Sequence, residues 1–208
     1  LVRAQFPKIP RRVSGYNLDF LLPENGFNVA RALVAGGLPA LEVTLRTPAA
    51  LEAIHEMARV EGGVVGAGTL LTPGDVQRAV EAGALFGVSP GATDRLLDAA
   101  EEAGLPLLPG AATATEAMRL LERGYTVQKF FPAEASGGAK ALAAIGAPIP
   151  QVSFCPTGGV SLANARDYLS LGNVLCVGGS WVAPKDAVAT GDWARIEALA
   201  REGSGLPR

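Results

Sequence analysis

The chain has 208 residues, of which 49% are hydrophobic and 18% are charged, and its formal net charge is −2. This length fits one domain with a substantial core, and the nearly neutral balance offers no basic field that would attract nucleic acid or an anionic membrane. No apolar run reaches the length of a membrane span, so we expect a cytoplasmic protein whose partners are small molecules or copies of itself.

Residues 1–16 mix basic residues with prolines and lack an apolar segment of signal-peptide length. We interpret them as a surface arm and predict a single folded domain over residues 17–208. Along that domain, apolar runs of strand length alternate with segments of helical periodicity.

The predicted strands are 17–22, which is the weakest, 40–46, 62–68, 85–91, 105–111, 126–132, 151–159 and 174–181. The predicted helices are 28–37, 49–60, 74–83, 94–104, 114–124, 139–146, 162–172 and 192–203. Several of these helices end in the glycine that commonly follows a helix C-terminus.

The spacing of the strands, about one βα unit each, indicates the fold class. Eight such units with nearly continuous apolar strands predict an α/β protein, a single-domain (β/α)8 TIM barrel with short loops. The alternative is an open doubly wound sheet. Its dinucleotide-binding version would carry G-x-G-x-x-G after the first strand, and neither "NLDFLLPENGF" nor "LEVTLRTPA" has that pattern.

The strand at 40–46 carries charges that an inert barrel would not need. Alternation along a strand puts Glu42, Thr44 and Arg46 on one side, opposite the apolar residues. If the apolar side faces the helices, two charges point into the barrel at the strand ends where such barrels place their chemistry. A structural ion pair would also explain Glu42 and Arg46, although burying two ions is costly before pairing offsets it.

Lys129 stands at the head of the apolar run "KFFPAE" and is predicted to face the same interior. Two cations and one carboxylate in one cavity would receive an anion. As an edge residue, the lysine could instead extend its ammonium to solvent. Burial beside Arg46 would favour the neutral amine, which can attack a ketone and form a Schiff base.

Two glycine-rich stretches, "PTGG" (156–159) and "GGS" (178–180), close the last two predicted strands. Barrels often bind phosphate at this place through backbone N–H groups. Each stretch alone is equally a tight turn that needs the backbone freedom of glycine. Together they favour a phosphate site, to which Thr157 and Ser180 could add hydroxyl donors.

The remaining candidates for chemistry are weaker. The single histidine, His55, falls within a predicted helix, so neither a catalytic triad nor a histidine-rich metal site can be built. Cys155 and Cys176 lie in separate apolar runs and are predicted to be buried free thiols.

The acidic residues outside the first charged strand have simple interpretations. Glu134 is the nearest candidate for a carboxylate magnesium site, and it could instead support Lys129 or cap a turn. Asp75, Asp94 and Glu116 are predicted to be first-turn residues of helices.

The motifs "LEVTLRT", "GAGT", "SPG", "KFFPAE", "FCPTGG" and "VGGSW", in this order and at this spacing, resemble a known family. It is the 2-keto-3-deoxy-6-phosphogluconate (KDPG) aldolase family, which overlaps with 4-hydroxy-2-oxoglutarate (KHG) aldolase. The resemblance covers residues 28–202. It implies a metal-independent enzyme without a cofactor, usually a homotrimer, that acts on a small 2-keto acid.

Residue roles follow from the same resemblance. It implies that Lys129 is the Schiff-base lysine, that Glu42 is the general acid and base, and that Arg46 binds the substrate carboxylate. Carboxylate binding would be helped by Thr69, and the pocket would be shaped by Pro90 and Phe131. The phosphate would be held by Gly158, Gly159, Gly179 and Ser180.

The resemblance therefore implies a class I aldolase of the Entner–Doudoroff pathway, which cleaves KDPG to pyruvate and glyceraldehyde 3-phosphate and also acts on KHG. Two other functions stay open from the residues alone. One is a non-covalent epimerase or isomerase that uses Glu42 and Lys129 as an acid/base pair. The other is a catalytically silent barrel that keeps the anion pocket.

Overall fold

The structure is a computed structural model that describes residues 23–207. Its helices and strands, in chain order, are α2 (Pro23–Ala35), β1 (Ala40–Thr44), α3 (Ala50–Met57), β2 (Val64–Gly68), α4 (Pro73–Glu81), β3 (Phe86–Val88), α5 (Asp94–Glu102), β4 (Leu107–Leu108), β5 (Gly110–Ala111), α6 (Ala114–Glu122), β6 (Val127–Phe130), α7 (Gly138–Gly146), β7 (Ser153–Pro156), α8 (Ala165–Leu169), α9 (Lys185–Thr190) and α10 (Trp193–Ser204). The predicted arm (1–16) and first strand (17–22) lie outside the described residues.

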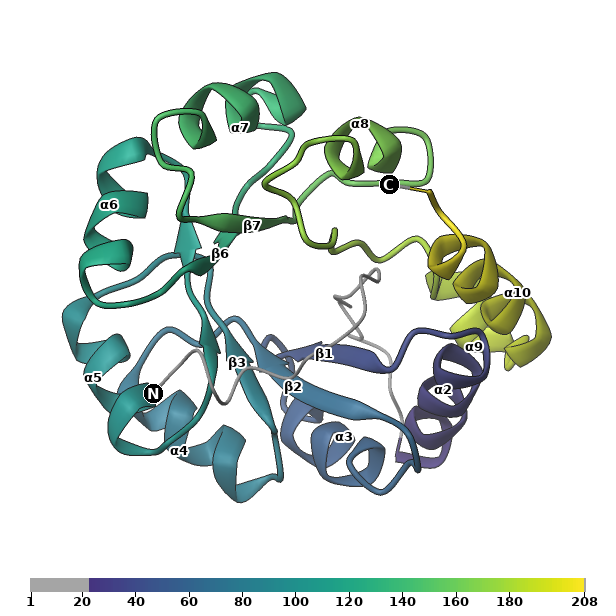
Figure 1. Ribbon diagram of the computed structural model, residues 1–208. Helices are drawn as coiled ribbons and strands as arrows, with labels where there is room; N and C mark the ends of the chain where they lie inside the picture. The colour runs from purple at the N-terminus through teal and green to yellow at the C-terminus, as the bar shows by residue number, and fades with distance from the viewer. Residues whose placement is uncertain (1–22, 208) are drawn as a thin grey trace.

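The strands are parallel and follow one another around a common centre, with the helices on the outside (Figure 1). One sheet has the order β1-β2-β3-β4 and the other has the order β5-β6-β7. Within each sheet, every strand therefore pairs with its neighbours in the chain, as repeated βα units require. The alternating strand and helix arrangement agrees with the predicted barrel class.

The predicted strand at 105–111 is split into β4 and β5, and the break falls at Pro109. Proline has no backbone N–H to give to the ladder. Its carbonyl still accepts a hydrogen bond from the Lys129 N–H at 2.8 Å, while the Leu108 carbonyl accepts one from Ser89 at 3.2 Å. The chain thus passes from one sheet to the other at this residue.

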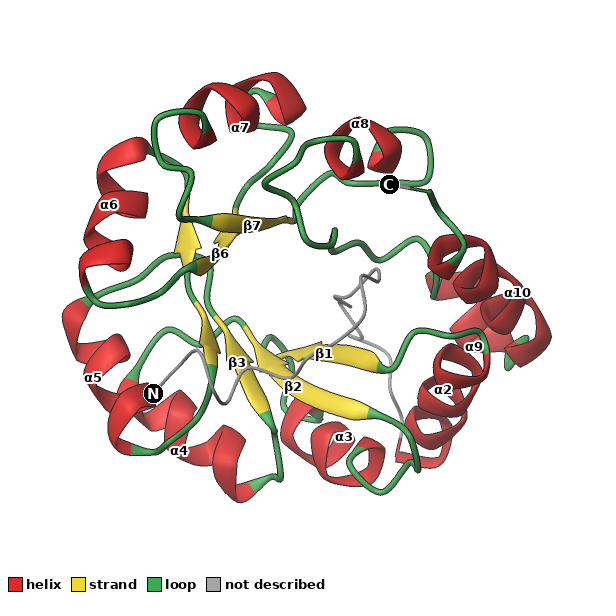
Figure 2. Cartoon of the chain, viewed as in Figure 1, coloured by secondary structure: helices red, strands yellow, loops and turns green. Residues whose placement is uncertain are grey.

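The prediction of a continuous strand at 174–181 is wrong. Two isolated parallel bridges, Phe154 to Val174 and Thr157 to Gly178, connect this segment to β7. It is otherwise loop between α8 and α9 (Figure 2). Adjacent glycines at 178 and 179 weaken strand regularity, because they offer no side chains to pack. The bridges nevertheless place the end of this segment beside the end of β7.

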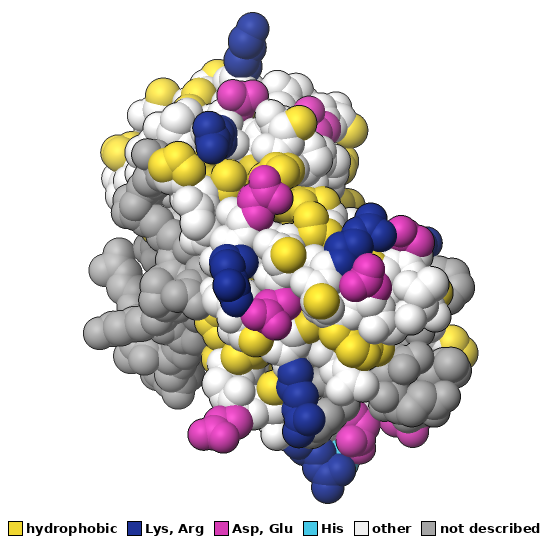
Figure 3. Space-filling view, turned by 90° about the vertical axis from the view of Figure 1, so that its right-hand side faces the viewer, with side chains coloured by type: hydrophobic (Ala, Val, Ile, Leu, Met, Phe, Trp, Pro, Cys, Tyr) yellow, Lys and Arg dark blue, Asp and Glu magenta, His cyan; other side chains and the backbone are white. Residues whose placement is uncertain are grey.

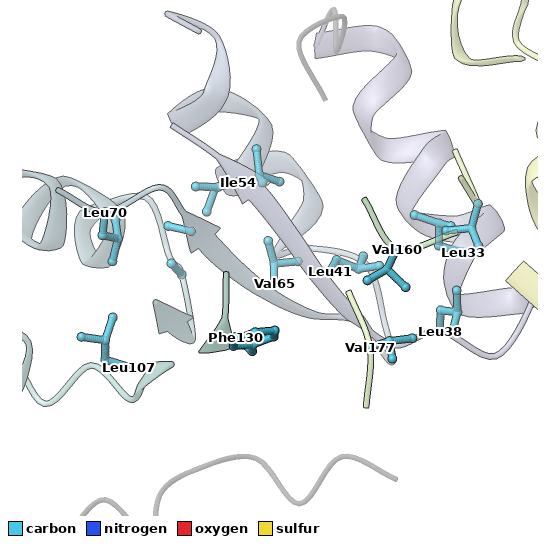
Figure 4. Packing of buried hydrophobic residues seen from close by; sticks show 14 of the residues in the cluster. Leu33, Leu38, Leu41, Ile54, Val65, Leu70, Leu107, Phe130, Val160 and Val177 are labelled. Atoms are coloured by element: carbon cyan, nitrogen blue, oxygen red, sulfur yellow. The ribbon is translucent and has the colours of Figure 1, made fainter. Parts of the chain in front are cut away.

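The two faces of the strands pack differently. Outward side chains such as Leu41, Val65 and Phe130 join the helices in the main core, part of which appears in Figure 4. Val43 also belongs to it, and Leu45 packs against it, so the predicted orientation of β1 is confirmed. A second, smaller cluster fills the inside of the ring and consists of Phe86, Val88, Leu108 and Cys155.

Three helices begin at threonines that accept a hydrogen bond from a backbone N–H: Thr72, Thr93 and Thr113. Asp75 and Glu116 complete capping boxes at two of them, as the prediction of first-turn acids requires. Backbone N–H donation from Ala112 is the main reason that the pKa of Glu116 lies below its usual value. These caps define the residue at which each helix begins after the preceding strand.

The helices that differ from prediction lie toward the chain ends. The helix expected at 162–172 is confined to α8, and α9 was not predicted because six residues are too short to show a clear apolar period.

Basic and acidic side chains are interspersed over the face shown in Figure 3. Within residues 23–207, no helix is both long and apolar enough to cross a membrane.

Candidate active site

A cavity of about 330 Å³ opens at the C-terminal ends of β1, β6 and β7. Its lining residues come from these strands and from the loops that follow them: Glu42, Thr44, Arg46, Lys129, Phe131, Thr157, Gly158, Gly159, Val160, Gly178, Gly179 and Ser180. Strand ends of parallel sheets gather residues that are far apart in sequence. Here they bring together two cations, one carboxylate and two glycine-rich loops.

β1 delivers two side chains to the cavity through its two-residue alternation, and the turn that follows it adds Arg46. Glu42 and Thr44 are buried, at 5% and 9% exposure, whereas Arg46 lies beyond the strand end and is exposed. Gly68 on β2 makes room for the carboxylate, because a Cβ at that position would overlap Glu42 Oε1. The site therefore has a buried acid below and a guanidinium at the rim.

Lys129 lies on β6 and is 7% exposed. Its Nζ is 3.9 Å from Glu42 Oε1 and 4.9 Å from the centre of the Phe131 ring. The strand register places it between Gly110 and Cys155. The lysine is thus an interior residue, and the alternative of an edge lysine with its head in solvent is wrong.

Cys155 lies next to Lys129 but does not line the cavity. It pairs with Lys129 in the register of β6 and β7, and it packs in the inner cluster with Val88 and Leu108. A hydrogen bond with Cys176, together with burial, raises the pKa of the Cys155 thiol. Both cysteines are free, as predicted, but only Cys155 is buried, whereas Cys176 is half-buried.

The "PTGG" loop follows β7 with two successive glycines in left-handed conformations, φ 91° at Gly158 and 84° at Gly159. These values favour glycine over any other residue. Thr157 is buried, and its Oγ1 has no hydrogen-bond partner among residues 23–207. A buried hydroxyl that lines a cavity without a partner is available to a ligand.

The "GGS" loop lies beside the "PTGG" loop through the bridge between Thr157 and Gly178. A Cβ at Gly179 would overlap the Trp181 ring, so glycine is needed here for close packing as well. Ser180 is exposed at the rim of the cavity. Residues of the two loops therefore lie together in the lining of the cavity, with Ser180 at its rim.

Two residues assigned by resemblance do not line this cavity. Thr69 directly follows β2 and has the left-handed φ of 62°, unusual for a residue with a side chain. Pro90 follows β3, and its carbonyl lies where a Cβ at Gly110 would be. Three lining residues, Thr44, Val160 and Gly178, were outside the predicted site, although strand alternation had already placed Thr44 beside Glu42.

Other candidate residues lie apart from the cavity lining. Glu134 accepts a hydrogen bond from the Tyr168 hydroxyl, and His55 is exposed on α3. Among the described residues, no three His, Cys, Asp or Glu side chains are grouped so that they could hold a metal ion. The chemistry within this cavity therefore depends on an amine, a carboxylate and anion-binding groups.

Comparison with known proteins identifies relatives over most of the chain. The family model "KDPG and KHG aldolase" matches residues 23–199. The KHG/KDPG aldolase of Escherichia coli K12 is 54% identical over 180 residues, covering 86% of this chain and 84% of the relative. The 2-dehydro-3-deoxy-phosphogluconate aldolase of Pseudomonas aeruginosa is 52% identical over 175 residues, covering 84% and 80%.

Solved structures agree with these sequence matches. The Zymomonas mobilis ZM4 KDPG aldolase with 3-phosphoglycerate has a TM-score of 0.90 at 44% identity and covers 100% of this chain and 96% of its own. The Legionella pneumophila KDPG aldolase, with pyruvate captured as a covalent carbinolamine, has a TM-score of 0.90 at 43% identity, covering 95% and 96%. The barrel class is confirmed, and the protein is an aldolase, a carbon–carbon lyase. The chain belongs to the KDPG and KHG aldolase family.

Proposed function

We propose that this protein is a class I aldolase that cleaves KDPG to pyruvate and glyceraldehyde 3-phosphate through a Schiff base on Lys129. The observation that carries the proposal is the buried amine of Lys129, 3.9 Å from the buried carboxylate of Glu42, in a cavity bordered by two glycine-rich loops. Activity on KHG is supported by the E. coli relative, whose name includes both substrates.

The first step joins the substrate to the protein. The Lys129 amine attacks the C2 ketone, a carbinolamine forms, and loss of water gives a protonated imine. The captured carbinolamine in the Legionella relative supports this route. Glu42 is the nearest carboxylate to the amine within the cavity, so it is placed to exchange protons during the dehydration.

Carbon–carbon cleavage then uses the imine as an electron sink. Glu42, directly or through a water, removes the C4 hydroxyl proton, the C3–C4 bond breaks, and its electron pair moves into the imine to give an enamine. The aldehyde product leaves. Protonation of the enamine at C3 and hydrolysis of the resulting imine release pyruvate and restore the amine.

The rest of the cavity would position the substrate. Arg46 offers a guanidinium suited to the carboxylate. Phe131 would shape the pocket around the reacting carbons, whereas Thr69 and Pro90 lie outside the cavity lining and have no direct contact with the substrate in this proposal. The phosphate would lie against the N–H groups and hydroxyls of the two loops: Thr157, Gly158, Gly159, Gly179 and Ser180.

The decisive experiment separates cleavage from its rivals. The protein is incubated with KDPG, and pyruvate and glyceraldehyde 3-phosphate are measured separately over time. We expect the two products to appear in equal amounts. A rearranged sugar phosphate without pyruvate would instead identify a non-covalent epimerase or isomerase. Thermal stabilisation by KDPG without any product would identify a silent anion-binding barrel.

We further propose a cytoplasmic homotrimer that works without a metal or cofactor in the Entner–Doudoroff pathway. Exposed apolar side chains support self-association: three of them, Leu71, Val80 and Leu85, lie on α4 or beside it. Light scattering during size-exclusion chromatography should give three times the chain mass. A monomer at micromolar concentration would contradict the trimer, and full activity after chelation would support the absence of a metal.

A further inference from the structure

A buried tyrosine and a carboxylate meet directly behind the "PTGG" loop. Tyr168 on α8 is 1% exposed, and its hydroxyl donates a hydrogen bond to Glu134 Oε1. Glu134 follows Lys129 by five residues, in the turn between β6 and α7. Burial and the neighbouring carboxylate raise the pKa of Tyr168, so the hydroxyl remains a donor. The residue that anchors Glu134 thus comes from another βα unit.

Glu134 in turn contacts the glycines of the loop. Its backbone N–H donates to the Gly158 carbonyl at 3.1 Å, next to a second hydrogen bond from Ala133 to Thr157 at 2.8 Å. Its Cγ and Cβ lie 2.6 and 2.7 Å from the place where a Cβ at Gly159 would be. The aliphatic part of Glu134 therefore packs directly against Gly159.

We propose that Tyr168 and Glu134 are positioning residues that hold the "PTGG" loop in the conformation that binds the substrate phosphate. The inference rests on the proposed function, because it requires a phosphate at this loop. Neither residue lines the cavity, so both act through Gly158 and Gly159. The hydroxyl of Tyr168 fixes the Glu134 side chain, and that side chain supports the loop from behind.

Two physical reasons make such support necessary. Consecutive glycines have many accessible conformations, so a loop that must aim its N–H groups at an anion gains from external restraint. A free carboxylate beside an anion site would also repel the ligand. The hydrogen bond from Tyr168 directs the Glu134 carboxylate toward α8. This contact limits the conformations of the loop and also reduces the repulsion between the carboxylate and the anion.

The test is the variant Tyr168→Phe, which removes the hydroxyl and keeps the ring. We expect KM for a phosphorylated 2-keto acid to rise about fivefold, the usual effect of one hydrogen bond. KM for the same acid without phosphate, and the yield of borohydride-trapped pyruvate, should stay within about twofold. The matched control is Tyr125→Phe, because that tyrosine is equally buried and its hydroxyl donates to Glu101 at 3.1 Å, away from the cavity.

Substitutions at Glu134 test the same contact from the other partner, which is exposed, so that little packing is lost with its side chain. Glu134→Ala should reproduce the selective rise in KM, whereas Glu134→Gln keeps the acceptor and the packing and should restore KM to near the wild-type value. An equal change for both substrates in Tyr168→Phe, or a rise in Glu134→Gln as large as in Glu134→Ala, would overturn the inference.

Ser180→Ala separates this inference from the proposed function. If that variant raises KM for the phosphorylated acid but Tyr168→Phe does not, the phosphate site stands and the positioning role fails. If neither variant changes KM more for the phosphorylated acid than for the unphosphorylated one, the phosphate site itself is wrong, and the positioning role is wrong as well.

Discussion

Two groups of charged side chains differ in their exposure and in the distance between opposite charges. At the surface, Arg123 reaches Asp98 at 2.7 Å, Glu101 at 2.9 Å and Asp94 at 3.6 Å, and all of these side chains are at least 27% exposed. Inside the barrel, the side chains of Lys129 and Glu42, taken without their backbone, are 9% and 6% exposed, and their nearest charged atoms are 3.9 Å apart. The close contacts are found where water screens charge, and the loose contact is found where charge is costly to bury.

This difference indicates what each group does. Exposed ion pairs contribute little individually, so the Arg123 cluster mainly ties α5 to the end of α6. A buried pair stabilises a fold only with excellent geometry, and apolar side chains often serve as well. The 3.9 Å between Lys129 Nζ and Glu42 Oε1 is too long for a direct hydrogen bond, so the amine and the carboxylate both remain able to contact a substrate, which suits catalysis better than stability.

The largest expected effect is loss of the amine. Lys129→Ala should lower kcat by a factor on the order of 10⁴ or more, because no covalent intermediate can form. Lys140→Ala is the matched control, since that lysine is exposed on α7 and should retain full activity. Progress curves and circular dichroism check activity and fold together. Retained cleavage in a folded Lys129→Ala protein would remove the lysine from the chemistry.

The second largest effect is expected from removal of the Glu42 carboxylate, which carries the protons. Glu42→Gln preserves shape and should lower kcat about 10²- to 10⁴-fold, the usual contribution of a general acid or base. Some pyruvate should still be trapped as a reduced adduct, because the amine remains. Single-turnover kinetics separate imine formation from cleavage. An unaltered kcat would mean that another group, or water alone, moves the protons.

A double variant tests whether the buried pair serves stability. Lys129→Met combined with Glu42→Gln removes both charges at nearly constant volume, and the free energy of unfolding should be unchanged or larger by about 1–4 kcal/mol. Urea denaturation measures this directly. A loss of several kcal/mol in the inactive double variant would show that the pair stabilises the fold after all.

The smallest effect belongs to the surface cluster. Arg123→Gln should lower the free energy of unfolding by about 1 kcal/mol, with a smaller difference at high salt, because exposed pairs are screened. The kinetic constants should not change. If this variant lowered kcat, the surface cluster would be connected to the cavity, and the contrast between the two groups would fail.

Local sequence rules predicted much of this molecule. The two-residue period of β1 was enough to send Glu42 inward and Leu41 toward the helices, and both placements are confirmed. The order of parallel strands followed from the repeated βα spacing. The first turns of α4 and α6 could be predicted from their acidic residues, Asp75 and Glu116, because each completes a capping box that is encoded within four residues.

The features that escaped prediction depend on long-range packing. The segment at 174–181 has an apolar strand pattern, but whether it forms a ladder depends on β7 and on its glycines. The contact between Glu134 and Tyr168 joins residues 34 apart in sequence, so no local pattern could indicate it. Whether Thr69 and Pro90 reach the cavity depends on loop geometry after the strands, which residue order alone does not define.

The most direct test of the account is covalent trapping. The protein is incubated with saturating pyruvate, with and without borohydride, and its intact mass and peptide map are measured. We expect one reduced pyruvate adduct per chain, located on Lys129 and dependent on borohydride. An unmodified folded protein, or an adduct spread over the other three lysines, Lys8, Lys140 and Lys185, would contradict the Schiff-base mechanism.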